Sequence, residues 1–114
     1  MKHSLARARI DIDLGALRRN GAAMARRAGV PLLPMIKGDA YGLGVEAAVR
    51  ALDRLEPWGY GIATVTEGEE LRRLGVARPV VVFTPLLKQD LARARVARLT
   101  PTLGFAEEIE AWKQ

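Results

Sequence analysis

Apolar and polar residues alternate in blocks along the chain, and each block predicts one short element. Five runs have the length and composition of strands, and they cover 8–14, 32–37, 58–63, 80–84 and 99–103. Between these runs apolar residues recur at helical spacing, and Asp13 and Gly29 are suited to begin and end the first helix. Thr66 and Glu69 have the spacing of a capping box for the helix that runs to Leu74.

The order strand, helix, strand, helix is typical of parallel strands joined by crossover helices, so the predicted fold class is α/β. Two closures fit this order, a doubly wound sheet and a (β/α)8 barrel. A full barrel takes about 250 residues, so the 114 residues of this chain hold about half of one. No low-complexity linker divides the chain, and we expect residues 1–114 to form one partial barrel domain. The chain stops inside or just after its last predicted helix, as a truncated domain would.

Composition adds few constraints to this fold prediction. The net charge is +5, but the arginines are spread along the chain, which is more typical of a solvated surface than of a nucleic-acid site. The chain has no cysteine, which removes disulfides and thiolate metal sites, and we expect no bound metal. No run approaches the ~20 apolar residues of a membrane span, and the N-terminus lacks the apolar stretch of a secretory signal. We therefore expect a cytoplasmic protein without membrane or nucleic-acid partners.

The segment that carries chemistry is 34–44, with the sequence P-M-I-K-G-D-A-Y-G-L-G. Lys37 ends an apolar strand, and ligands of parallel α/β folds bind at the carboxyl ends of strands. Partial burial would lower the pKa of this lysine, and a neutral amine can attack an aldehyde to form a Schiff base. Tyr41 could reach an anionic group, and the N-terminus of the next helix is a favourable place for a phosphate. The alternative interpretation is a lysine that simply points to solvent.

The residues around Lys37 resemble the signature of the alanine racemase family. The sequence K-G-D-A-Y-G-L-G at 37–44 is similar to K-A-[ND]-A-Y-G-H-G, which follows an apolar strand in that family. Two positions depart from the pattern, because Gly38 replaces the usual alanine and Leu43 the usual histidine. The resemblance extends in the same order over nearly the whole chain, and its further segments are 8–20, 60–72 and 78–83.

This resemblance implies a fold-type III enzyme that uses pyridoxal 5'-phosphate. An N-terminal (β/α)8 barrel would hold the cofactor, and a C-terminal β domain, absent from these residues, would complete the site across a homodimer. Lys37 would bind the cofactor covalently and act as one acid or base, and Tyr41 would contact the cofactor phosphate. The implied activity is that of an isomerase that converts L-alanine to D-alanine for peptidoglycan precursors.

Racemisation needs an acid or base on each face of the α-carbon. The resemblance implies that the second is a tyrosine from the partner's C-terminal domain, and that the arginine beneath the pyridine nitrogen also lies beyond residue 114. Neither Tyr60, at a predicted strand start, nor His3 suits the role. We therefore expect a fragment that is inactive alone. The alternatives are a non-catalytic cofactor binder, a half-barrel that assembles with a second copy or a complementing chain, and an inactive remnant.

Overall fold

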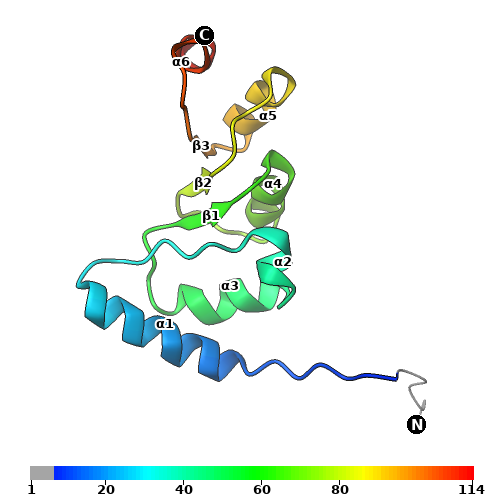
Figure 1. The fold of residues 1–114 in the computed structure, drawn as a ribbon, viewed down its shortest axis with the longest axis vertical. Coiled ribbons are helices and arrows are strands. Elements are labelled where there is room, and N and C mark those ends of the chain that lie inside the picture. Colours follow the sequence, from blue (N-terminus) through cyan, green and yellow to red (C-terminus); the bar gives the residue numbers. More distant parts are fainter. Residues whose placement is uncertain (1–6) are drawn as a thin grey trace.

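The computed structural model describes residues 7–114, and its strands form one parallel sheet. Three strands lie side by side in chain order (Figure 1), β1 (Tyr60–Ile62), β2 (Val80–Val82) and β3 (Thr100–Pro101). A fourth segment pairs with β1 in the same direction through a bridge between Met35 and Gly61. The predicted order of parallel βα units is therefore confirmed.

Helices connect the parallel segments. In chain order they are α1 (Leu14–Ala28), α2 (Lys37–Tyr41), α3 (Val45–Asp53), α4 (Val65–Arg73), α5 (Leu91–Val96) and α6 (Ala106–Lys113), with a 3-10 turn η1 (Lys88–Asp90) before α5. As predicted, α1 begins at Asp13, whose carboxylate accepts from the Ala16 N–H at 2.9 Å, and ends at a left-handed Gly29. The capping box of α4 is formed by Thr64 and Glu67. The predicted capping box of Thr66 and Glu69 is wrong by two residues, because β1 is shorter than expected and the extended backbone ends sooner.

The hydrophobic core lies between the sheet and helices α3, α4 and α5. The strand residues Tyr60, Ile62, Val80 and Val82 are at most 1% exposed, and burial of each aliphatic side chain stabilises the fold by about 1.5–3 kcal/mol. They form one cluster with buried helix residues, among them Ala48, Val49, Leu52, Val65, Leu71 and Ala94. Strand alternation sends the next side chains to the opposite face, where Phe83 is 46% exposed. One face of the sheet is thus covered by helices and the other is open.

The predicted strand over 32–37 is present only as an irregular segment. The Gly61 N–H donates to the Pro34 carbonyl at 2.8 Å, and the Ile36 N–H donates to the Gly61 carbonyl at 2.9 Å. Pro34 has no N–H to extend the ladder, and the Trp58 N–H bonds instead to the Leu32 carbonyl at 2.8 Å. The segment lies where the prediction put it, but it forms one bridge rather than a continuous ladder.

The N-terminal residues depart further from the prediction. Residues 7–13 run as an extended arm away from the sheet (Figure 1), and no strand of the described residues pairs with them. The predicted strand over 8–14 is therefore wrong within this structure, because a strand requires a partner strand. The lack of a partner leaves Ile10 86% exposed. None of the helices within residues 7–114 has the length and apolar character that a membrane crossing requires.

A polar network closes the amino-terminal edge of the sheet. Arg78 Nε donates to Asp53 Oδ1 at 2.6 Å, and the Tyr60 hydroxyl donates to the same oxygen at 3.1 Å. The hydrogen bond from Arg78 lowers the pKa of Asp53, whereas burial and the bond to Asp53 raise the pKa of Tyr60. Tyr60 therefore fixes the end of the sheet opposite to Lys37.

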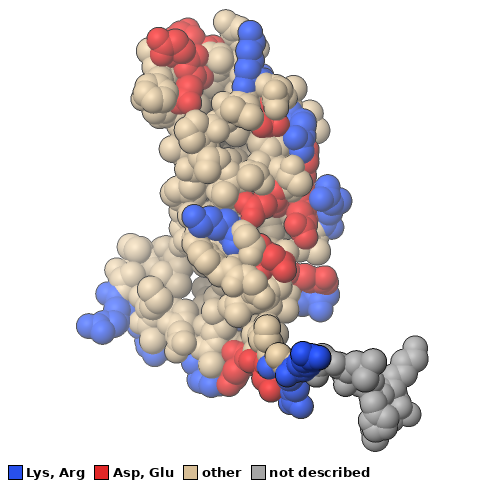
Figure 2. Space-filling model, turned by 45° about the vertical axis from the view of Figure 1, so that its right-hand side comes forward, with Lys and Arg blue, Asp and Glu red and all other residues tan. Residues whose placement is uncertain are grey.

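Charged residues of both signs are spread over the surface. On the face shown in Figure 2, basic and acidic side chains are interspersed, with an uncharged region between them. Several arginines pair with carboxylates, as in Arg78–Asp53 and Arg93–Glu69, both at 2.6 Å. On this face the basic side chains do not form one continuous patch.

Arg72 joins the loop after α4 to the loop after α5. Its guanidinium donates four hydrogen bonds of 2.7–2.9 Å to backbone carbonyls, those of Val76, Arg78, Ala97 and Arg98. We expect Arg72→Met to lower the free energy of unfolding by about 2–3 kcal/mol, because hydrogen bonds to charged groups contribute ~1.5–3 kcal/mol each and some carbonyls would regain water. Urea denaturation followed by circular dichroism measures this loss.

Arg73→Met is the matched control, because Arg73 is the adjacent residue of α4 and is exposed. We expect it to change the free energy of unfolding by less than about 0.5 kcal/mol. Equal losses in the two variants would contradict the role given to Arg72.

Candidate active site

The carboxyl ends of the parallel segments meet at one edge of the sheet. Lys37 follows the segment that pairs with β1, Thr64 follows β1, and Thr84 follows β2. The Phe83 N–H donates to the Ile62 carbonyl at 2.8 Å, and the Thr84 hydroxyl donates to the Ala63 carbonyl. These contacts hold successive strand ends together, so Lys37 lies at the edge where the fold predicts a ligand.

Lys37 begins a turn of left-handed backbone. Gly38, Asp39 and Ala40 have φ of 55–60° and ψ of 44–49°, and Tyr41 has φ of 56°. Left-handed helical backbone costs a residue with a side chain roughly 1–2 kcal/mol, and three of these four residues are not glycine. Such conformations persist only where surrounding contacts enforce them, and they concentrate at functional sites. The turn is therefore an independent structural reason to regard this segment as a site.

Hydrogen bonds on both sides hold this turn. Asp39 Oδ1 accepts from the Val45 N–H at 2.8 Å, and the Asp39 carbonyl accepts from the Gly44 N–H at 2.9 Å. On the other side, Glu67 Oε2 accepts from the Gly38 N–H at 2.6 Å. Ala40 is buried inside the turn and is only 4% exposed. The backbone around Lys37 is thus fixed by α3 and by α4.

Lys37 and Tyr41 are brought together by the turn. The Lys37 ammonium nitrogen lies 6.0 Å from the centre of the Tyr41 ring, within the range of a cation–π contact. Within residues 7–114, no salt bridge or side-chain hydrogen bond occupies this ammonium group. Lys37 is exposed, and Tyr41 is 65% exposed. The prediction of a partly buried Lys37 is wrong for this chain, because the face of the sheet beside it carries no helix.

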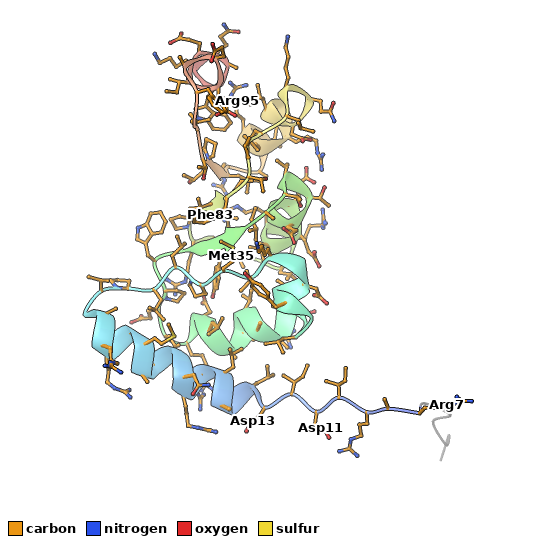
Figure 3. The ribbon with its side chains drawn as sticks, viewed as in Figure 1. Arg7, Asp11, Asp13, Met35, Phe83 and Arg95 are labelled. Atoms are coloured by element: carbon orange, nitrogen blue, oxygen red, sulfur yellow. The ribbon has the colours of Figure 1, made fainter. Side chains whose placement is uncertain are left out.

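The open face next to this edge is apolar. Met35, two residues before Lys37, and Phe83 both close over Gly61, where an added Cβ would lie 2.8 Å from the Phe83 ring and 3.0 Å from the Met35 methyl group. Figure 3 shows the two labelled side chains near each other at β1 and β2. Apolar side chains of this kind can contact the aromatic ring of a ligand, and a lysine amine can attack an aldehyde group.

The predicted phosphate site at the N-terminus of α3 needs correction. The first free N–H of this helix, that of Val45, is already bonded to the Asp39 carboxylate, and Glu46 follows in the first turn. Two negative side chains use the favourable end of the helix dipole and oppose a further anion there. The role of Tyr41 as a phosphate contact stays a prediction.

The sequence patterns did not identify Glu67 or Asp39 as residues of the site. The spacing Thr64–x–x–Glu67 was the available signal for the capping box, and three glycines at 38, 42 and 44 were the signal for an unusual turn. Gly38 itself adopts positive φ, which a glycine reaches without the penalty of a side chain. Gly38 therefore adopts this backbone at a lower conformational cost than an alanine would here. His3 lies outside the described residues.

Comparison with known proteins gives a consistent result. A family model described as alanine racemase, N-terminal domain, matches residues 12–114. The alanine racemase of Deinococcus radiodurans is 35% identical over 108 residues, which are 94% of this chain and 31% of that protein. The chain therefore spans less than a third of the length of this curated relative.

Solved structures show the same relation. The crystal structure of alanine racemase from E. faecalis matches with a TM-score of 0.84 at 26% identity, over 90% of this chain and 28% of that one. The histidine racemase from Leuconostoc mesenteroides matches with a TM-score of 0.80 at 19% identity, over 87% of this chain and 27% of that one, and shows the fold alone. The predicted α/β class and partial barrel are confirmed.

The role of Asp39 can be tested by two substitutions at one position. Asp39→Ala removes the acceptor for the Val45 N–H, and we expect it to lower the free energy of unfolding by about 1 kcal/mol, as the loss of a helix cap does. It should also speed amide hydrogen exchange at Val45. Asp39→Asn keeps an oxygen acceptor and tolerates positive φ, so it should leave both nearly unchanged. Equal effects of the two substitutions would refute the capping role.

Proposed function

The chain belongs to the alanine racemase family through its N-terminal domain, and we propose that it supplies the cofactor-binding part of an amino-acid racemase. The observation that carries this proposal is the place of Lys37, an exposed amine on a fixed left-handed turn where parallel strands end. The proposed ligand of this amine is pyridoxal 5'-phosphate. The proposed phosphate contact is the hydroxyl of Tyr41, four residues away.

The residues present fit such a group. The ammonium nitrogen of Lys37 is free of ion pairs among the described residues, and the apolar pair Met35 and Phe83 closes over Gly61 on the open face of the sheet. Along the turn, a Cβ added at Gly38, Gly42 or Gly44 would meet no atom within 4 Å. The turn therefore leaves room for a ligand close to its backbone. These features support Lys37 and Tyr41 as the cofactor-binding residues.

The chemistry follows from the needs of racemisation. When bound, the pyridoxal group accepts the electron pair left when the α-proton departs. Lys37 would hold the group and transfer the proton at one face of the α-carbon. The opposite face needs a second base, and we propose that a tyrosine of a C-terminal domain in a partner copy provides it, as the family resemblance implies.

The proposed substrate is alanine, converted between its L and D forms for peptidoglycan precursors. The 35% identity to a D. radiodurans protein named alanine racemase supports this choice. The fold does not decide it, because a histidine racemase shares the fold. The cytoplasmic location stays a prediction.

A second candidate function is a non-catalytic cofactor binder or a half-barrel that assembles with another chain. The open sheet face favours this possibility. Phe83 is 46% exposed on that face, and Trp58, just before β1, is 52% exposed. A second copy or a complementing chain could cover these side chains. Assays of D-alanine formation separate an enzyme from a binder.

Cofactor capture at Lys37 can be measured directly, because the chain has only four lysines, Lys2, Lys37, Lys88 and Lys113. We expect the chain mixed with pyridoxal phosphate and reduced with borohydride to carry the pyridoxyl group mainly on Lys37, as peptide mass spectrometry would detect. Lys37→Ala should abolish this label, whereas Lys113→Ala should retain it. Uniform labelling of all lysines, or no label on a folded chain, would rule out the proposed site.

A further inference from the structure

Glu67 has hydrogen bonds to two loops that are far apart in the sequence. Its Oε1 accepts from the N–H groups of Ala63 and Thr64, at 2.8 and 3.1 Å, and its Oε2 accepts from the Gly38 N–H at 2.6 Å. The first pair of bonds belongs to the capping box of α4. The third connects α4 to the residue that follows Lys37.

The bond to Gly38 exceeds what helix capping requires. The same chain offers an internal comparison in α6, where Glu108 occupies the same position in its helix. Glu108 Oε2 accepts from the N–H groups of Gly104 and Phe105, at 2.6 and 3.2 Å, both just before the helix. Glu108 therefore serves its own helix only. Glu67 divides its two oxygens between its helix and the turn that carries Lys37.

The consequence for Lys37 is that both of its flanking peptides are held. On the side before it, the Ile36 carbonyl accepts from the Ala40 N–H at 3.0 Å, and the Ile36 N–H donates to the Gly61 carbonyl at 2.9 Å. On the side after it, the N–H of Gly38 is fixed by an ionised acceptor, which gives shorter and stronger hydrogen bonds than a neutral one. The bond is made to Gly38, the first residue of the left-handed turn, and left-handed backbone is unfavourable for the three non-glycine residues that follow.

We infer that Glu67 is a positioning residue for Lys37, which fastens the left-handed turn to α4 and so sets where the amine stands at the strand ends. This inference rests on the proposed function of Lys37. Glu67 acts through the Gly38 peptide and touches neither the Lys37 amine nor a reacting atom. Both oxygens of the Glu67 carboxylate are used, because Oε1 caps α4 and Oε2 holds the turn.

The discriminating variant is Glu67→Gln. Its amide oxygen can still accept from Ala63 and Thr64, but its NH2 group faces the Gly38 N–H with a donor instead of an acceptor. The matched control is Glu70→Gln, one turn further along α4, which changes the charge in the same way. Circular dichroism first establishes that both variants keep the helix content of the parent chain.

Two readouts decide the inference. In nuclear magnetic resonance spectra of the chain without cofactor, Glu67→Gln should shift the Gly38 amide proton upfield and speed its exchange, and Glu70→Gln should do neither. In pyridoxal-phosphate trapping with borohydride, Glu67→Gln should slow labelling of Lys37 on the order of tenfold, as loss of a supporting hydrogen bond does. An unchanged Gly38 amide, or an unchanged labelling rate beside a changed amide, would overturn the inference.

These readouts separate this inference from the proposed function. If the parent chain itself takes no label at Lys37, the proposed cofactor site fails, while the Gly38 amide still reports whether Glu67 holds the turn. If Glu67→Gln does not fold, the parent chain supplies the answer through the scalar coupling across the hydrogen bond between the Gly38 nitrogen and the Glu67 carboxyl carbon. Its detection supports the contact, and its absence in a spectrum that detects the backbone couplings of β1 and β2 refutes it.

Discussion

Two backbone hydrogen bonds at Gly61 hold the segment before Lys37 against β1, and the position of the candidate site depends on them. Gly61 donates to Pro34 at 2.8 Å and accepts from Ile36 at 2.9 Å. Because this position has no side chain, Met35 and Phe83 can close over it. The pairing brings Lys37 to the edge where the later strands also end. Without it, the lysine would belong to a loop rather than to a parallel α/β site.

The turn beyond this pairing joins structural support and the candidate site in one short stretch. Left-handed backbone at Asp39, Ala40 and Tyr41 is unfavourable, and the supporting contacts come from α3 through Asp39 and from α4 through Glu67. The left-handed turn places Lys37 and Tyr41 near each other, and it leaves space beside its glycines. The helices that bury the core therefore also fix the turn at the candidate site.

Much of this arrangement was predictable from the sequence, because local pattern determines it. The order of βα units and the cap at Asp13 follow from residue type and spacing, whereas the candidate site at 37–44 also rests on the family resemblance and stays a prediction. The extended arm at 7–13 could not be predicted, since a strand pattern does not reveal whether a partner strand exists. The left-handed turn and the Glu67 contact to Gly38 depend on residues 29 positions apart, which local patterns do not connect. The exposure of Lys37 depends on which elements cover the open face.

The most direct test of the central claim is a crystal structure of this chain grown with pyridoxal phosphate and reduced with borohydride. We predict continuous density from the Lys37 amine to the pyridoxyl carbon, positive φ at Asp39, Ala40 and Tyr41, and the phosphate within reach of the Tyr41 hydroxyl. A pyridoxyl group on another lysine, or a right-handed turn at 38–41 with Lys37 unmodified, would contradict the account.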